Sequence, residues 1–87
     1  MTAPPPSVIA RVQSVIERVT GPGRTPPHVG PDTPLGDGVW LDSIELVNVT
    51  VGCEEEFGIV FDALPRGTFH TLGTLAAAVQ ARLTAHA

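Results

Sequence analysis

The fold of this chain is decided by residues 41–58, which read LDSIELVNVTVGCEEEFG. Apolar residues recur there at steps of three and four, the spacing of the buried stripe of an amphipathic helix. The stripe consists of Leu46, Val49, Cys53 and Phe57. A second apolar stripe, made of Ile44, Val47 and Val51, points elsewhere on the same helix. Such a helix is either buried on both sides or offers one stripe to another molecule.

The start of this helix carries an acidic residue followed by a hydroxyl. Asp42 is a favoured N-cap residue because its carboxylate can accept hydrogen bonds from the N–H groups of the first turn. Ser43 then takes the first helical position, where free N–H groups and the positive end of the helix dipole favour an anion. We therefore expect the Ser43 hydroxyl to project into solvent and to tolerate a phosphate ester.

A longer pattern surrounds this pair. Asp42-Ser43, with Leu46 and the block Glu54-Glu55-Glu56-Phe57-Gly58-Ile59 at fixed spacing, resembles the acyl carrier proteins. The resemblance covers residues 41–82, with a looser match in the first helix. Its downstream positions are the apolar residues Phe61, Phe69, Leu72, Leu75 and Val79, and Thr71 as the cap of the last helix. In that family the serine after the aspartate carries a phosphopantetheine arm, whose terminal thiol holds an acyl chain as a thioester.

The resemblance implies an all-α fold, a four-helix bundle with three main helices, a short third helix and a long loop between helices one and two. It implies a free-standing acyl carrier protein that shuttles acyl intermediates between biosynthetic enzymes. The unusual long loop favours polyketide or other specialised metabolism, and the small size of the chain argues against its being an enzyme itself. A phosphopantetheinyl transferase that needs magnesium would load Ser43 from coenzyme A, and Asp42 would cap the helix. Acyltransferases, ketosynthases or ligases with basic patches would dock on a face made of Ile44, Glu45, Val47, Val51, Glu54 and Glu55.

Length and composition bound the rest. The 87 residues suffice for one domain with a core near the lower limit for independent folding. We expect a disordered lead-in over residues 1–6, which contain three prolines in a row, and a carrier domain over residues 7–87. No run of residues is long and apolar enough for a membrane span, and the N-terminus lacks a signal pattern. The expectation is a cytoplasmic monomer.

The charge is acidic and unevenly placed, with a formal net charge of −4, five arginines and no lysine. No arginine or lysine lies between Arg24 and Arg66, where the chain carries Asp32, Asp37, Asp42, Glu45, Glu54, Glu55, Glu56 and Asp62. This argues against nucleic-acid binding, which needs a cationic surface, and favours partners that present arginine and lysine. A surface that merely aids solubility is the alternative.

Three glutamates crowd the last turn of the predicted helix, where the helix dipole disfavours anions by ~0.3–1 kcal/mol each. They are Glu54, Glu55 and Glu56. Stability alone would prefer lysine or arginine at these positions. A local rule broken without a structural gain is typical of a functional surface.

The flanking segments are predicted from the same rules. Ser7 is expected to cap a first helix whose buried face is Val8, Ile9, Val12, Val15, Ile16 and Val19, and Gly21 to end it. Residues 21–42 form a long loop anchored by Leu35, Val39, Trp40 and Leu41. Gly58 should take a left-handed conformation, and residues 62–68 could hold a short helix. Thr71 or Thr74 should cap a last helix that buries Leu72, Leu75, Ala76, Val79 and Leu83.

Two features depart from the family pattern. Five residues separate Leu35-Gly36 from Asp42, whereas one is common, and this insertion brings Trp40 near the attachment site. Trp40 is either a core plug or a residue that shapes the arm, its cargo or a docking surface. In addition, Asn48 stands five residues after the serine, where an acidic residue is common.

Two other functions remain open. A peptidyl or aryl carrier shares the arm but has glycine before the serine more often than aspartate. An unmodified acidic helical adaptor would only bind a basic partner.

Catalytic and metal chemistry are disfavoured. The only cysteine, Cys53, lies on the buried stripe and is interpreted as an apolar filler. The three histidines have no zinc-ligand spacing. Ser43 is not flanked by the glycines of the sharp turn that carries a hydrolase nucleophile, and the sequence identifies no base for it. The carboxylates lie on a helix expected to be exposed rather than in an apolar pocket, which disfavours general acid–base catalysis.

Overall fold

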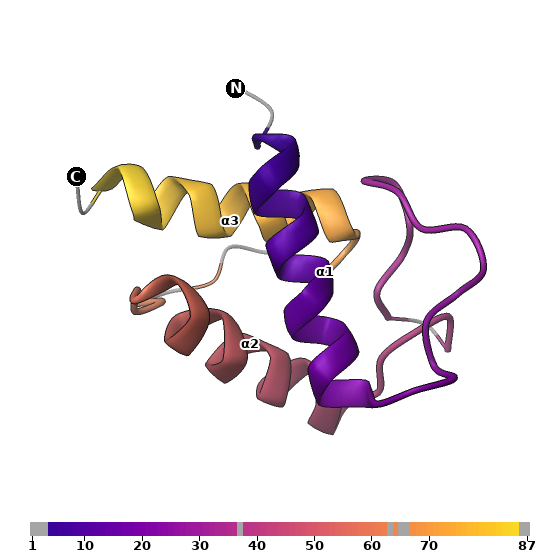
Figure 1. The fold of residues 1–87 in the computed structure, drawn as a ribbon. Helices are drawn as coiled ribbons and strands as arrows, with labels where there is room; N and C mark the ends of the chain where they lie inside the picture. The colour runs from indigo at the N-terminus through magenta and orange to yellow at the C-terminus, as the bar shows by residue number, and fades with distance from the viewer. Residues whose placement is uncertain (1–3, 37, 63, 65–66, 86–87) are drawn as a thin grey trace.

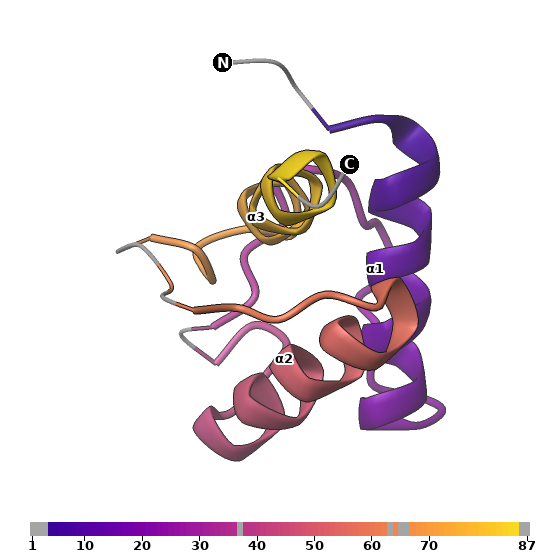
Figure 2. The ribbon, with the colours of Figure 1, turned by 90° about the vertical axis from the view of Figure 1, so that its left-hand side faces the viewer.

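The computed structural model describes residues 4–36, 38–62, 64 and 67–85. Over these residues the chain forms three α-helices and no strand beyond one isolated bridge. Helix α1 spans Pro6–Thr20, α2 spans Ser43–Phe57 and α3 spans Leu72–Ala85. Helix α1 packs against both other helices, whereas α2 and α3 share few direct contacts. Helix α1 crosses in front of α3 and the start of α2 in Figure 1, and after the 90° turn it stands to one side of both helices (Figure 2). The all-α class is confirmed.

Helix α1 starts earlier than predicted. Pro5 holds the N-cap position without a side-chain hydrogen bond, and Pro6 is the first helical residue. The predicted cap by Ser7 is wrong, because a proline with its fixed φ and no N–H already suits the first turn. Of the predicted lead-in, residues 1–3 lie outside the described residues, and Pro6 belongs to α1. Gly21 ends the helix with a φ of 81°, as its sequence predicts.

The core is filled by the predicted apolar faces of all three helices together with the long loop. Its fully buried side chains, each with 0% exposure, are Val12, Val15, Ile16, Leu35, Val49, Cys53, Leu72, Leu75, Ala76 and Val79. Two members of the predicted α2 stripe, Leu46 and Phe57, are only partly buried at the two ends of the helix. Phe61 and Phe69 also pack against the core from its edge.

The long loop is held by backbone hydrogen bonds to the start of α3. Gly73 N–H donates to the Pro31 carbonyl at 2.8 Å, and Leu72 N–H donates to the Thr33 carbonyl at 3.0 Å. Leu35 N–H donates to the His70 carbonyl at 3.2 Å. These hydrogen bonds fix the loop against α3. A connection of this length without secondary structure of its own is uncommon in a small domain unless it is held in such a way.

The predicted loop anchors are confirmed for three residues of four. Leu35, Trp40 and Leu41 are buried. Val39 is 49% exposed, so its prediction as an anchor is wrong. Its N–H closes a turn onto the Gly36 carbonyl at 3.1 Å, and the chain reaches the core only at the next residue.

Two glycines allow close approach between segments. A Cβ on Gly52 in α2 would lie 2.8 Å from Val15 Cγ1 of α1. A Cβ on Gly73 would lie 2.8 Å from the Pro31 carbonyl oxygen. The missing side chain at Gly52 leaves room for the Val15 side chain of α1 against the α2 backbone, and the one at Gly73 lets the loop backbone meet the α3 backbone.

The segment between α2 and α3 begins and ends as predicted. Gly58 takes the left-handed conformation, with a φ of 65°, and Thr71 caps α3 through reciprocal hydrogen bonds with Thr74. The expected short helix is not found in the described residues of 62–68, of which 63, 65 and 66 lie outside the description. Gly67 has a φ of 89°, a conformation that no right-handed helix accommodates.

Candidate functional site

The start of α2 is fixed by a capping box between Asp42 and Glu45. The Glu45 N–H donates to Asp42 Oδ1 at 2.7 Å, and the Asp42 N–H donates to Glu45 Oε1 at 3.0 Å. Asp42 is the N-cap residue and Ser43 the first residue of the helix, which confirms the predicted geometry. Two otherwise unpaired N–H groups are satisfied reciprocally, so the position of Ser43 is set by its neighbours on both sides.

Ser43 is exposed, and its hydroxyl makes no hydrogen bond to another described residue. The side chain of Trp40 lies in the core at 3% exposure and leaves Ser43 accessible. Burial of Trp40 agrees with its interpretation as a core plug. Its indole Nε1 is buried without a hydrogen-bond partner among the described residues, which is the cost of placing this large side chain there.

An arginine that sequence analysis did not single out completes the start of α2. Arg24 Nη1 and Nη2 each lie 2.8 Å from one carboxylate oxygen of Glu45. Nη2 also donates to the Trp40 carbonyl at 2.9 Å. The guanidinium of Arg24, followed by the Asp42 N–H, holds the pKa of Glu45 below its ordinary value. In the sequence, Arg24 is the last arginine before a long acidic stretch. This position is the one signal from which its pairing with a carboxylate of that stretch could have been predicted.

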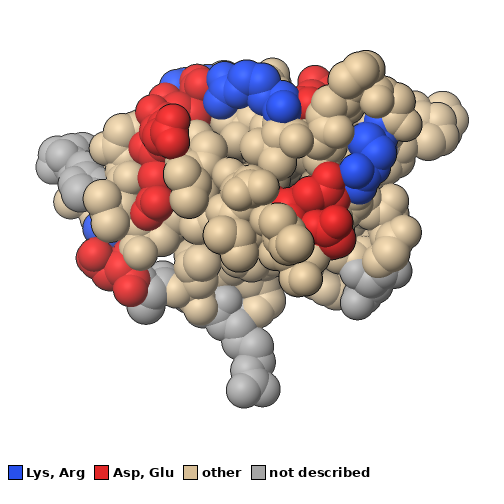
Figure 3. Space-filling view, turned by 90° about the horizontal axis from the view of Figure 1, so that it is seen from below, with Lys and Arg blue, Asp and Glu red and all other residues tan. Residues whose placement is uncertain are grey.

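The second apolar stripe of α2 faces solvent. Ile44 is 72% exposed, Val47 is 62% exposed and Val51 is 46% exposed. Exposed β-branched side chains on one helix face gain nothing from the fold, and such a patch is typical of an interaction site. Figure 3 views the molecule from the side on which α2 lies in Figure 1.

The glutamates at the end of α2 have structural partners. Arg11 contacts Glu56 Oε2 at 3.0 Å, Arg18 contacts Glu56 Oε1 at 3.4 Å, and the Arg11 guanidinium lies 4.3 Å from the centre of the Phe57 ring. Glu54 Oε2 accepts the Phe61 N–H at 2.8 Å. The interpretation that this block lacks a structural gain is therefore wrong for Glu54 and Glu56. Glu55 remains exposed.

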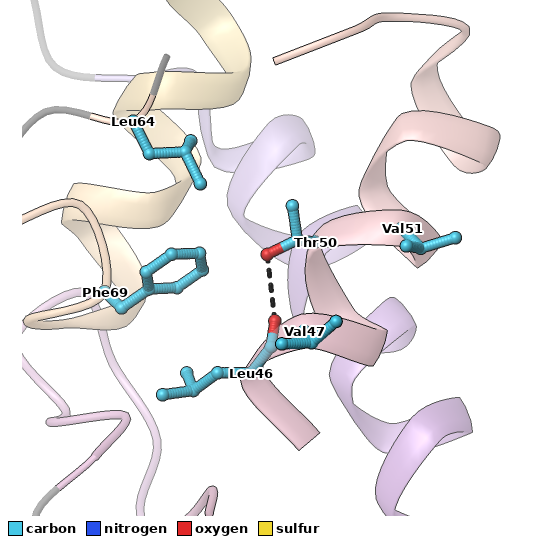
Figure 4. Close-up of a pocket in the computed structure, with 6 residues that line it drawn as sticks. All are labelled: Leu46, Val47, Thr50, Val51, Leu64 and Phe69. Carbon is cyan, nitrogen blue, oxygen red and sulfur yellow. Dashed lines mark hydrogen bonds between the residues drawn. The ribbon is translucent and has the colours of Figure 1, made fainter. Parts of the chain in front are cut away.

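An apolar groove of about 380 Å³ lies between α2 and the segment that precedes α3. Its lining residues are Leu46, Val47, Thr50, Val51, Leu64 and Phe69. In Figure 4, Leu64 and Phe69 point across the groove toward Leu46 and Thr50. The Thr50 hydroxyl donates to the Leu46 carbonyl at 2.9 Å, so its polar atom is satisfied within the helix and its methyl group is left to the groove.

The remaining groups offer little chemistry. Cys53 is buried, and this burial raises the pKa of its thiol to about 12, so it is a poor nucleophile and an apolar filler. No cluster of three or more metal-ligating side chains occurs among the residues that the structure describes. None of the described helices has the length and hydrophobicity needed to cross a membrane.

Comparisons with known proteins do not add to this picture: no family model, no curated protein and no solved structure matches the chain.

Proposed function

We propose that this protein is a carrier of acyl groups, with Ser43 as the attachment point of a phosphopantetheine arm. The observation that carries the proposal is the exposed Ser43 hydroxyl at the first position of α2, directly after the Asp42 cap. This hydroxyl makes no hydrogen bond to a described residue, so a phosphate ester on it would break no such bond. The resemblance of residues 41–82 to the acyl carrier proteins supports the same assignment.

The residues around Ser43 fit a phosphodiester. The N–H groups of Ser43 and Ile44 lie in the first turn of α2, where no earlier helical carbonyl can accept from them. Together with the positive end of the helix dipole they favour phosphate oxygens beside the serine. The arm would supply a terminal thiol that forms a thioester with the cargo. The chain itself would hold the attachment point rigid and leave catalysis to its partner enzymes.

In the loading step, the Ser43 oxygen would form a bond to the phosphopantetheine phosphorus of coenzyme A. The pyrophosphate bond of coenzyme A would break, adenosine bisphosphate would leave, and a base of the transferase would take the serine proton. That enzyme would also hold the magnesium ion. Solvent exposure of Ser43 is what this step requires of the carrier.

The cargo is proposed to be an acyl chain. The groove begins at Leu46 and Val47, which are three and four residues after Ser43 and so lie on the same side of α2 one turn further along. Its apolar lining favours a hydrocarbon chain over the charged amino group of an aminoacyl cargo. This observation favours an acyl carrier over a peptidyl carrier, as does Asp42.

The wider proposal is a cytoplasmic monomer in polyketide or related specialised metabolism. The segment 62–68 would stand in the place of the short third helix of the family's four-helix bundle. Transferases, acyltransferases, ketosynthases or ligases would dock on the exposed face of α2, formed by Ile44, Val47 and Val51, with Glu55 at its end.

Intact mass spectrometry tests this function. The purified protein is incubated with coenzyme A, magnesium and a broad-specificity phosphopantetheinyl transferase. We expect the native chain to gain the mass of one phosphopantetheine group and Ser43→Ala to gain none. Alanine is an excellent helix former, so the variant should keep the helical circular dichroism of the native chain. A folded native protein that stays unmodified would favour an unmodified helical adaptor.

A further inference from the structure

The acidic residues of α2 and its cap differ in how far their charge is available. They are Asp42, Glu45, Glu54, Glu55 and Glu56. The Glu45 side chain is only 15% exposed, and both of its oxygens lie 2.8 Å from guanidinium nitrogens of Arg24. One of these oxygens also accepts the Asp42 N–H. A partner's cation could reach Glu45 only by displacing Arg24.

The same holds at the other end of the helix. Glu56 is held by Arg11 and Arg18, and one oxygen of Glu54 accepts a backbone N–H. Glu55 is exposed and Asp42 is exposed, although Asp42 Oδ1 accepts the Glu45 N–H. In Figure 3 the acidic side chains lie in separate groups to the left and to the right of an uncharged stretch of surface, and arginines adjoin several of these groups.

We propose that Arg24 determines partner specificity by holding the Glu45 carboxylate out of partner contacts, so that the face beside Ser43 fits an apolar partner surface better than a basic one. Charge complementarity supports this occupant. The Arg24–Glu45 ion pair is closed within the chain and adds no net charge that would steer a cationic surface, so Asp42 is the exposed carboxylate left beside Ser43. Ile44 and Val47 offer apolar area one turn apart. The inference rests on the proposed carrier function.

Arg24 has a second contact that its removal would also break. Its bond to the Trp40 carbonyl ties the loop to the start of α2. A purely structural arginine and a masking arginine therefore predict opposite changes. Loss of structure would lower the rate of reaction with every partner enzyme. Unmasking of Glu45 would raise the rate with a basic partner and make that rate more dependent on salt.

The test measures kcat/KM for loading by a phosphopantetheinyl transferase whose carrier-facing surface is basic, from about 0.05 M to about 0.5 M salt. We expect Arg24→Gln to raise kcat/KM about two- to fivefold at low salt, the range of an exposed ion pair, and to steepen its salt dependence. The double variant, Arg24→Gln with Glu45→Gln, should have the native kcat/KM and the native salt dependence. Arg18→Gln is the matched control, because it also removes one arginine charge that is paired with a glutamate of α2, here Glu56. It should change neither kcat/KM nor its salt dependence.

Glu45→Gln alone tests the proposal even if Arg24→Gln does not fold, because glutamine can still complete the capping box. Because Arg24 is then left without its carboxylate, we expect this variant to lower kcat/KM about two- to fivefold at low salt and to return to the native value at about 0.5 M salt. A fall of fivefold or more that persists at about 0.5 M salt would show that Glu45 already contacts the partner and would overturn the inference. Unchanged kinetics for folded Arg24→Gln would overturn it too. A native protein that is not loaded at all refutes the proposed function instead, and the inference with it.

Discussion

At the scale of single residues, the valines of α2 serve different purposes although the chain places them close together. Val49 is fully buried in the core, whereas Val47, two residues earlier, is 62% exposed. The period of the helix separates them, because residues two apart lie on nearly opposite sides. One valine belongs to the core and the other to the face proposed to meet partners.

This difference predicts unequal costs for the same substitution. Val49→Ala should lower the free energy of unfolding by about 1–3 kcal/mol, because it leaves a cavity in a closed site. Val47→Ala should change it by no more than about 0.5 kcal/mol. Urea unfolding followed by circular dichroism measures both. A large loss for Val47→Ala would place this side chain in the core and remove it from the docking face.

The residues that sequence predicted best are those governed by local rules. Asp42, Ser43, Gly58 and Thr71 were placed correctly because caps and left-handed turns depend on hydrogen bonds within one helical turn. The partners of Arg24 and Arg11 were not predictable in this way. Each ion pair joins residues 21 or 45 positions apart and exists only once the chain has folded.

At the scale of elements, the long loop and α3 form one unit. The loop runs beside the start of α3, and the bridge between Pro34 and Thr71 lies among the hydrogen bonds that join them. Periodicity of the apolar residues was enough to predict the three helices. It could not predict this docking, since the decisive feature is the missing side chain of Gly73 rather than an apolar pattern.

Gly73→Ala should therefore destabilise the protein by about 1–3 kcal/mol, the usual cost of overpacking. The new Cβ would meet the Pro31 carbonyl oxygen, a backbone atom that cannot rotate away, at 2.8 Å. Thermal unfolding measures the loss. Gly36→Ala is the matched control, because its Cβ would meet nothing within 4 Å and its φ lies outside the positive range. Equal melting temperatures for Gly73→Ala and the native protein would contradict the close packing.

At the scale of the whole molecule, ion pairs tie the two ends of α2 to α1 and to the long loop. Glu56 links the end of α2 to two arginines of α1, and Glu45 links the start of α2 to the loop. The Arg11 hydrogen bond and the nearby Arg18 lower the pKa of Glu56 from its ordinary value of 4.5, against a smaller opposing effect of burial. Arg24 lowers the pKa of Glu45.

These shifts predict a dependence of stability on pH. A carboxyl whose pKa is lower in the folded state than in the unfolded state stabilises the protein fully above its unfolded pKa, and this stabilisation is lost as the pH falls through the folded pKa. Melting temperature should thus decrease below about pH 4.5. The difference between the native protein and Glu56→Gln should be largest at neutral pH and shrink in acid. Glu55→Gln is the control, and a Glu56→Gln difference that grew in acid would contradict the ion pairs.

The central claim concerns the oxygen that carries the arm, and the chain has three serines, Ser7, Ser14 and Ser43. The most direct measurement is fragmentation mass spectrometry of the protein after loading from coenzyme A. We predict that the phosphopantetheine mass, and the acyl mass attached to it after reaction with a partner enzyme, map to Ser43 alone. Modification at Ser7 or Ser14, or a folded protein that carries no added group, would contradict the account.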